Sequence, residues 1–312
     1  MDVVRGIEAL PLAAGQAVVT IGFFDGVHLG HRAVLVRTVD AARERGVRAV
    51  AVTFDRHPRE ILTPDNVPRL ITTVERRASL IEAVGIDTLI VLEFTEELSR
   101  WPAEEFMRRV LAEGLAAVHV VVGANFTFGH RALGTVETLS KEGPTHGFTA
   151  EGVGLLDVDG RRISSSSVRD ALAEGDLAWP QTALGRRFVL DGEVVPGHGR
   201  GKELGFPTAN LRTWPRLLLP GGGIYAGRVE LHGSPYVAAI SVGTNPTFGV
   251  EPLHVEAYLL EYDGHDLRGQ PLSVEFWARL RDEERFVSPE ALVRAISDDV
   301  ERTREIVSGP DR

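Results

Sequence analysis

The feature that most constrains the fold is a strand–turn–helix pattern near the amino end. Val18–Ile21 is a short β-branched run, and a glycine-containing turn leads from it into a helical pattern from Ala33 onward. His28 and His31 lie where that helix begins. Helix N-termini carry unpaired N–H groups that favour phosphate, and residues three apart share one helix face. The pattern predicts a phosphate site with both histidines; the alternative is an ordinary turn with two solvated histidines.

The rest of the first half repeats this alternation. Apolar runs predict strands at 47–54, 88–92 and 118–122, with helical patterns between them at about 73–84 and 103–113. Continuous apolar strands separated by helices are typical of a parallel sheet covered on both faces. We therefore predict a doubly wound, Rossmann-like α/β fold, in which ligands bind at the carboxyl ends of the strands.

Polar loops follow three of the predicted strands. After the HLGH turn of the first strand come Asp55, His57 and Pro58 behind the second, and Asn125 behind the fourth. Because the carboxyl ends of parallel strands meet at one edge of the sheet, we predict a shared site there. Each loop taken alone is also compatible with an ordinary turn.

A serine-rich segment, RRISSSSVRD, occupies residues 161–170. Ser167 and Asp170 approximate a helix capping box, which accounts for one of the four serines. The others are framed by Arg162 and Arg169. Hydroxyls, helix N-terminal amides and guanidinium groups together suit a polyphosphate, so we predict polyphosphate binding here.

The second half changes character from residue 188 onward. After a helical linker at 176–186, closely spaced strand patterns are broken by glycine and proline, which favours a small antiparallel barrel. The predicted strands are 189–195, 225–231, 236–242, 254–260 and 272–280. Ser288 and Pro289 open a final helix. Its predicted apolar face consists of Leu292, Ile296, Val300 and Ile306. A chain of 312 residues suits two domains, which we place at 1–185 and 186–312.

A glycine-rich stretch, PGHGRGKELGFPTAN, lies at 196–210 within the predicted barrel. It is not a P-loop, because Pro196 stands in place of the first glycine and Glu203 follows the lysine. A flexible turn is the simplest interpretation. Thr208 and Asn210, however, offer neutral oxygens beside a basic loop, a combination that suits Mg²⁺-nucleotide.

Composition narrows the class of protein. The net charge of −10 argues against a non-specific nucleic-acid binder, and the absence of cysteine excludes disulfides and thiolate catalysis. Residues 1–16 lack a signal-peptide pattern, and no apolar run approaches the roughly 20 residues of a membrane helix. We expect a cytoplasmic protein with no membrane or nucleic-acid partner; oligomerisation is left open.

Taken together, these motifs resemble the prokaryotic bifunctional riboflavin kinase/FAD synthetase family over nearly the whole chain. The matching stretches are GFFDGVHLGH, FDRHP, VVGANFTFG, RISSSSVR, GRGKELGFPTAN, GIYAG, SVGTNPTFG and the region around Glu256. The resemblance implies an N-terminal module that adenylylates FMN to FAD and a C-terminal module that phosphorylates riboflavin to FMN. It implies ATP as co-substrate and Mg²⁺ as cofactor of both.

The resemblance also implies site residues in the first module. Contacts with the phosphates of ATP and the transition state would come from His28, His31, Asn125, Arg162, Ser165, Ser166 and Arg169. The ATP-binding turn would consist of Gly22, Phe23, Phe24, Asp25, Gly30 and His31. The flavin would be bound by Asp55, His57, Pro58, Phe126 and Phe128.

In the second module, the resemblance implies that Glu256 is the base that accepts the 5′-hydroxyl proton of riboflavin. Taken by itself, Glu256 alternates with apolar neighbours on a strand and would more often face solvent. Nucleotide contacts are implied for Gly199, Arg200, Gly201, Lys202, Gly205, Pro207, Thr208 and Asn210, of which Thr208 and Asn210 would bind Mg²⁺. Arg281 and Phe286 would either meet the flavin or clamp the final helix to the barrel.

Two departures from the family pattern keep alternatives open. Ser166 stands where the motif usually has threonine, and Leu62 where some members place an aromatic residue near the flavin. One alternative is therefore a single-activity riboflavin kinase with a weakened N-terminal module. Two others are a relative of class I aminoacyl-tRNA synthetases, which share an HxGH-like turn, and a flavin-binding sensor without turnover.

Overall fold

The computed structural model of the protein describes residues 1–10, 15–197, 200–244, 253–262 and 266–309. Contacts divide the chain into two compact units. The first consists of Met1–Arg69 and Val74–Ser165, and the second of Leu70–Thr73 and Ser166–Arg312. The domain boundary at 185/186 stays a prediction. None of the helices in the described part of the chain has both the length and the apolar character needed to cross a bilayer.

The first unit is built on a parallel six-stranded sheet with the order β1-β4-β3-β2-β5-β8. Its strands are β1 (Asp2–Arg5), β2 (Ala17–Ile21), β3 (Arg48–Phe54), β4 (Thr88–Leu92), β5 (Ala117–Gly123) and β8 (Thr149–Val153). The predicted parallel α/β sheet is confirmed. The two outermost strands, β1 and β8, were not predicted; β1 is largely exposed and β8 contains Glu151 and Gly152.

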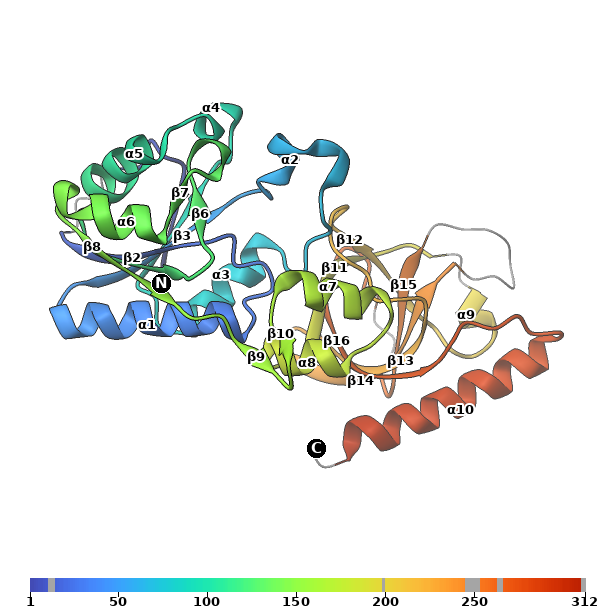
Figure 1. Ribbon diagram of the computed structural model, residues 1–312. Coiled ribbons are helices and arrows are strands. Elements are labelled where there is room, and N and C mark those ends of the chain that lie inside the picture. Colours follow the sequence, from blue (N-terminus) through green and yellow to red (C-terminus); the bar gives the residue numbers. More distant parts are fainter. Residues whose placement is uncertain (11–14, 198–199, 245–252, 263–265, 310–312) are drawn as a thin grey trace. The chain divides into compact units, whose positions relative to one another are not determined.

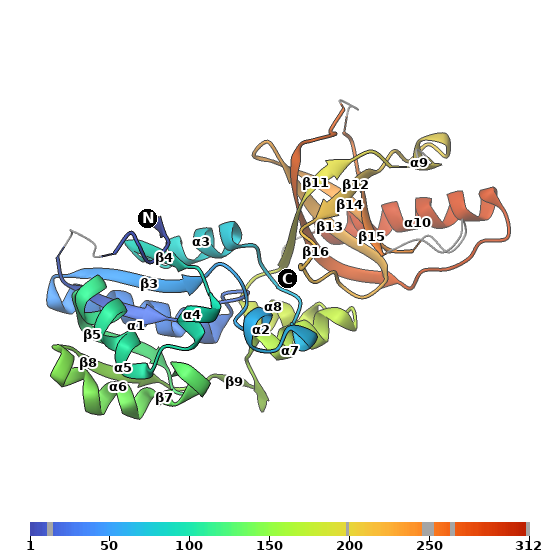
Figure 2. The ribbon, with the colours of Figure 1, turned by 90° about the horizontal axis from the view of Figure 1, so that it is seen from above.

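Helices cover both faces of this sheet (Figures 1 and 2). On one face lie α1 (Leu29–Arg45) and α3 (Val74–Glu82); on the other lie α5 (Ala103–Phe106), the π-helical segment Met107–Gly114 and α6 (Val136–Glu142). Successive strand residues point to opposite faces, so Val18 packs with Leu35 and Ile81 whereas Val19 packs with Val110. The continuous apolar runs of the sequence therefore fill two cores.

Shorter elements decorate the first unit. They are α2 (Arg59–Leu62), α4 (Glu96–Ser99), the hairpin-like pairs β6 (Thr127–Phe128) with β7 (Gly134–Thr135) and β9 (Asp157–Val158) with β10 (Arg161–Arg162), and 3₁₀ turns at Pro64–Asn66, His130–Ala132 and Gly143–His146.

The position of β2 in the sheet locates the expected binding edge. From β2 the chain runs outward to β3 and β4 on one side, and later returns to place β5 on the other side of β2. This reversal is a topological switch point, where ligands bind at the carboxyl ends of the flanking strands. The loops that leave those ends are the HLGH turn after β2 and the segment containing Asn125 after β5.

The second unit is a closed barrel with the order β11-β12-β15-β14-β13-β16, and all its neighbouring strands are antiparallel. The strands are β11 (Phe188–Val195), β12 (Ala209–Thr213), β13 (Gly223–Leu231), β14 (Ser234–Gly243), β15 (His254–Leu259) and β16 (Pro271–Arg281). The predicted antiparallel barrel is confirmed. Strand β12 was missed, because Ala209 and Asn210 were assigned to a glycine-rich loop.

Among the described residues, four helices accompany the barrel: α7 (Ser165–Ala173), α8 (Ala178–Leu184), α9 (Arg200–Glu203) and α10 (Pro289–Ser308). Helix α7 begins at Ser165, so the predicted capping box with Ser167 as its first residue is wrong. Ser167 lies inside the first turn, and its hydroxyl accepts a hydrogen bond from Nε1 of Trp179 at 3.2 Å.

The final helix begins as predicted, with the Ser288 hydroxyl accepting from the Ala291 amide and Pro289 in the first turn. It packs on β13, β14 and β16. Its fully buried residues are Asp299, Thr303 and Val307, whereas Ile306 is 37% exposed. The predicted place of Ile306 on the buried face is therefore wrong.

Candidate active sites

The turn after β2 has an unusual backbone. Phe24 (φ 53°), Gly26 (φ 78°) and Val27 (φ 40°) all adopt left-handed conformations. Residues other than glycine rarely do so, and such strain persists only where surrounding contacts over-determine the conformation. Both Phe24 and Val27 are buried, and the Val27 amide donates to the Phe24 carbonyl oxygen at 3.0 Å. The turn is thus a packed, strained structure rather than a loose loop.

The two histidines lie together at the start of α1. His28 is the N-cap, and its Nδ1 accepts a hydrogen bond from the His31 amide at 3.2 Å. The two rings stack with centroids 3.6 Å apart, and the His31 ring also meets the edge of Phe24 at 5.3 Å. His28 is only 7% exposed. The alternative of two solvated histidines is wrong, because His28 is buried and caps the helix. A helix N-terminus favours an anion through its amides and its partial positive charge.

The segment after β5 carries the second part of the site. Asn125 is exposed in the turn that follows Gly123, at the strand next to β2. The Phe126 ring is half-buried and stacks on Phe128 with centroids 5.7 Å apart. Phe128 is buried and packs with Phe106 in the core of the sheet. Phe126 is therefore the more accessible of the two predicted flavin contacts.

The loop after β3 is held to the turn after β2. The His57 ring meets Phe23 edge-on at 4.8 Å, so the two predicted motifs are brought together. Asp55 organises the loop: its Oδ1 accepts from the Phe94 amide at 2.9 Å, and its Oδ2 accepts from Arg56. The hydrogen bond from Arg56 to Asp55 raises the pKa of the guanidinium above its usual value. Leu62, on α2, is exposed.

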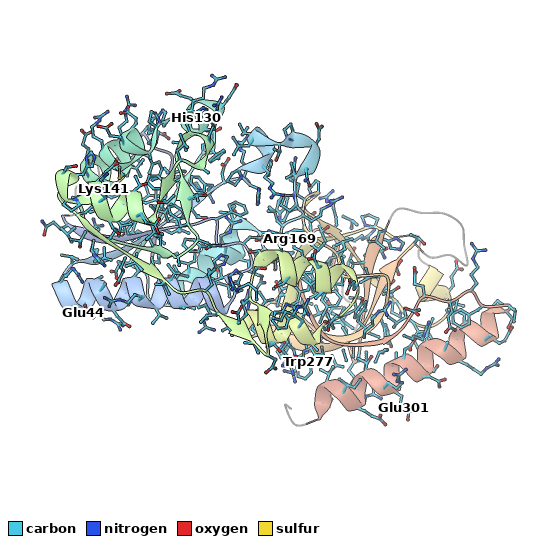
Figure 3. The ribbon with its side chains drawn as sticks, viewed as in Figure 1. Glu44, His130, Lys141, Arg169, Trp277 and Glu301 are labelled. Carbon is cyan, nitrogen blue, oxygen red and sulfur yellow. The ribbon has the colours of Figure 1, made fainter. Side chains whose placement is uncertain are left out.

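The serine-rich segment also reaches this turn. The Ser165 hydroxyl donates to the carbonyl oxygen of Asp25 at 3.0 Å, although 140 residues separate them. Arg162 is exposed and forms an ion pair with Asp157 across the β9–β10 ladder. Ser166 and Arg169 belong to the second unit, where Figure 3 shows Arg169 on α7. Ser165, a predicted phosphate-binding residue, therefore lies in the first unit and contacts the turn after β2.

In the barrel, Thr208 and His254 both contact the carboxylate of Glu256. The Thr208 hydroxyl donates to Oε2 of Glu256 at 2.8 Å, and Nε2 of His254 lies 3.2 Å from Oε1. Asn210 on β12 is directly opposite Glu256 on β15 in the strand register. His254, Glu256 and Tyr258 share the less buried face of their strand. Glu256 is therefore not an isolated surface carboxylate.

The glycines before β12 are demanded by close packing. A Cβ on Gly201 would collide with the Phe206 carbonyl oxygen, whereas a Cβ on Gly197 would displace only the side-chain amide of Asn210. Gly205 has φ 87°, which favours glycine. Pro207 is exposed. The predicted contact Gly199 and the side chains of Arg200 and Lys202 lie outside the described residues, as does the region 245–252.

Arg281 forms an ion pair with the final helix. Its guanidinium grips the buried carboxylate of Asp299 with Nε at 3.1 Å from both oxygens and Nη2 at 2.7 Å from Oδ2. Its Cζ lies 5.6 Å from the centre of the Phe286 ring. These contacts agree with the alternative in which Arg281 and Phe286 clamp the final helix to the barrel. The flavin contact of Arg281 and Phe286 stays a prediction.

One buried residue beside the first site was missed from the sequence. Arg77 lies on α3 beneath Phe23, with its Cζ 4.2 Å from the ring centroid. The available signal was its position in the helix, four residues before the buried Ile81 and therefore on the same face.

Comparison with known proteins assigns the two units. A family model described as FAD synthetase matches residues 11–167, and one described as riboflavin kinase matches residues 184–307. The chain belongs to the bifunctional riboflavin kinase/FMN adenylyltransferase family. It accordingly has riboflavin kinase and FMN adenylyltransferase activities and produces FAD. The predicted bifunctional enzyme of FAD biosynthesis is confirmed, and the family implies ATP, riboflavin and FMN as its substrates.

The similarity to individual members of the family extends over the full chain. A protein named bifunctional riboflavin kinase/FMN adenylyltransferase from Pseudomonas fluorescens is 38% identical over 99% of this chain and 98% of its own. Those from Escherichia coli K12 (33%, over 98% and 97%) and Bacillus subtilis 168 (32%, over 91% and 90%) carry the same name. A crystal structure titled macrolide-efflux protein from Streptococcus pneumoniae matches with TM-score 0.87 and 28% identity, over 97% of this chain and 99% of its own.

Proposed function

We propose that the two reactions occur at two separate sites. Adenylyl transfer takes place at the carboxyl ends of β2 and β5, and riboflavin phosphorylation takes place beside Glu256 in the barrel. Two observations support this division. The strained turn and the N-terminus of α1 lie at the switch point of the sheet. In the barrel, Glu256 on β15 lies opposite Asn210 on β12 and accepts a hydrogen bond from Thr208, which directly precedes β12.

In the adenylyl transfer, a phosphate oxygen of FMN attacks the α-phosphorus of ATP, the bond between the α-phosphorus and its bridging oxygen breaks, and pyrophosphate leaves. Negative charge grows on the non-bridging oxygens, and positioned donors stabilise it without a covalent intermediate. His28, His31 and Asn125 would serve the transferred group together with the amides of α1. The departing phosphates would be bound by Arg162 and Ser165, and the phosphate contacts of Ser166 and Arg169 stay predictions.

The flavin of the first site would lie against the loop after β3. His57, packed on Phe23, and the half-buried ring of Phe126 are the accessible predicted contacts. Asp55 would act through the loop it organises, because both its oxygens already accept hydrogen bonds from the protein.

In the kinase reaction, Glu256 would accept the proton of the riboflavin 5′-hydroxyl as that oxygen attacks the γ-phosphorus and ADP leaves. A carboxylate with an oxygen 2.8 Å from the Thr208 hydroxyl is the observation that carries this assignment. His254, 3.2 Å from the other oxygen, would orient the carboxylate.

A magnesium ion would fit beside these residues. Thr208 and Asn210 supply neutral oxygens next to one carboxylate, and Mg²⁺ binds few protein oxygens while keeping waters and substrate phosphates as ligands. Within the described residues, no group of three or more His, Cys, Asp or Glu side chains is placed to hold a metal. When bound, Mg²⁺ supplies positive charge to the nucleotide phosphates.

The experiment is chromatography of riboflavin, FMN and FAD after incubation of the purified protein with riboflavin, ATP and Mg²⁺. We expect FMN to form first and FAD to follow. Accumulation of FMN without FAD would instead support the single-activity alternative. Because Ser166 stands where the family motif usually has threonine, the variant Ser166→Thr would then test whether this residue weakens the N-terminal module. Removal of Mg²⁺ with a chelator is expected to stop both reactions. A cytoplasmic location stays a prediction.

A further inference from the structure

Arg77 is a buried cation with no assigned role in the two proposed reactions. Its side chain on α3 has 0% exposure, and burial lowers the pKa of its guanidinium to about 10, while the charges of Asp25 and Glu75 act in the opposite direction. Nε and Nη2 have no hydrogen-bond partner among the described residues. Buried charges with unsatisfied donors destabilise a fold, so the position calls for a role beyond packing.

The contacts of Arg77 lead to the turn after β2 by two routes. Nη1 donates to the Thr53 hydroxyl and to the Phe54 carbonyl oxygen, each at 3.1 Å, and the Thr53 hydroxyl in turn donates to the Phe23 carbonyl oxygen at 3.0 Å. The guanidinium also stacks on the Phe23 ring, with Cζ 4.2 Å from its centroid. One side chain therefore fixes both the ring and the carbonyl group of Phe23.

Phe23 enters the strained turn that carries the phosphate site. Phe24 and Val27 hold left-handed backbone conformations, and Asp25 is only 1% exposed. The Asp25 charge attracts Arg77, and its carbonyl oxygen is held from the other side by Ser165. The Phe24 ring packs on His31, which stacks on His28. Contacts thus run without a break from Arg77 to both histidines.

We propose that Arg77 is a positioning residue for adenylyl transfer, which holds the Phe23–Asp25 turn in the strained form that places His28 and His31 at the phosphates of ATP. Because the cation is buried, it acts through the turn rather than on the substrate. Placing the adenylylation site at this turn is part of the function proposed above, and the inference rests on it.

Arg77→Met removes the charge and the donors while keeping an unbranched apolar side chain. We expect kcat for FAD formation from FMN to fall about 100-fold, the size of effect that a displacement of roughly 1 Å produces in an active site. Riboflavin phosphorylation by the same polypeptide should be unchanged, which reports that the second unit is intact, and a cooperative melting transition of the first unit reports that the unit containing Arg77 is folded. Wild-type FAD formation by Arg77→Met, with or without a lower melting temperature, would overturn the proposal.

Arg77→Lys provides a second readout that a purely structural role would not move. A buried ammonium has a pKa below its usual value of about 10.4. As pH rises from about 7 to about 9, the lysine variant should lose its proton and its FAD-forming activity, while the wild type keeps the arginine charge. Parallel pH profiles of the variant and the wild type would contradict the proposal even if Arg77→Met is too unstable to purify.

Arg109→Met is the matched control. Arg109 also stacks on an aromatic ring of the first unit, with Cζ 4.8 Å from the Trp101 centroid, but it is half-exposed and pairs with Glu105. Its replacement should leave FAD formation at the wild-type rate. His28→Asn separates the location of the site from the role of Arg77. If this variant retains FAD formation, the proposed site is wrong. If it loses FAD formation while Arg77→Met stays fully active, only the role of Arg77 is refuted.

Discussion

The two units place phosphate-binding groups by different means. In the first, loops that leave the carboxyl ends of separate strands must be held in place, and the turn after β2 relies on Thr53, Ser165 and Arg77 behind it. In the barrel, the ladder between β12 and β15 sets Asn210 opposite Glu256, with Thr208 hydrogen-bonded to the same carboxylate. Backbone register does the positioning there.

This difference predicts different sensitivities. A loop-built site should lose activity when residues behind it are changed, because the strained turn can relax. A site fixed by strand register should respond mainly to changes in the reacting groups themselves, because the ladder persists without them.

The largest effect is expected for Glu256→Gln. This change keeps the shape and a hydrogen-bonding oxygen for Thr208 but removes the base, and general-base catalysis contributes about 10² to 10⁴ in rate. FMN formation should fall by about that factor, while supplied FMN is still converted to FAD. The two rates are measured separately by chromatography. Rapid FMN formation by this variant would remove Glu256 from the mechanism.

His28→Asn should come next. Asparagine is a good N-cap, so α1 keeps its capping oxygen while the imidazole is lost. We expect FAD formation to fall about 10²-fold, the loss typical of one positioned transition-state donor, with riboflavin phosphorylation unchanged. An unchanged melting temperature would show that the loss is chemical. Full FAD formation would mean that the stacked histidines serve only the helix.

Arg281→Met tests whether the barrel residue is a clamp. Breaking a buried ion pair leaves the Asp299 carboxylate uncompensated, which costs about 3 kcal/mol of unfolding free energy. Denaturant unfolding monitors the loss, and the double variant Arg281→Met/Asp299→Leu should recover most of it. If instead stability holds and the KM for riboflavin rises, Arg281 contacts the flavin.

Ser165→Ala is the mildest change. It removes one hydrogen bond to the Asp25 carbonyl oxygen, worth about 1 kcal/mol, so FAD formation should fall about five-fold. Thr208→Ala is the corresponding test in the barrel and should slow only the kinase reaction. With FMN supplied as substrate, a greater loss of FAD formation in Thr208→Ala than in Ser165→Ala would contradict the two-site division.

Strands buried on both faces could be predicted from the sequence, whereas edge strands could not. Apolar strands buried on both faces, such as β2 and β4, produce continuous runs that stand out. The edge strands β1 and β8 have no such run, and β12 was hidden because its first residues end a glycine-rich motif. Local periodicity does not report a partner strand that lies about fifty residues away along the chain.

The candidate sites show the same limit. The motifs contained His28, Glu256 and Ser165, whose residue types suit phosphate chemistry. The hydrogen bond from Ser165 to the Asp25 carbonyl and the burial of Arg77 arise from tertiary packing, because neither partner is near in sequence. An arginine in a helix is most often exposed, so its type argued against the buried position it occupies.

The central claim is that two independent sites share one chain, and mixing the two variants tests it most directly. Glu256→Gln alone should form almost no product from riboflavin, and His28→Asn alone should stop at FMN. With both in one reaction containing riboflavin, ATP and Mg²⁺, FMN released by the second should be adenylylated by the first, so FAD appears. Absence of FAD from the mixture, although each variant performs its remaining reaction alone, would contradict the account.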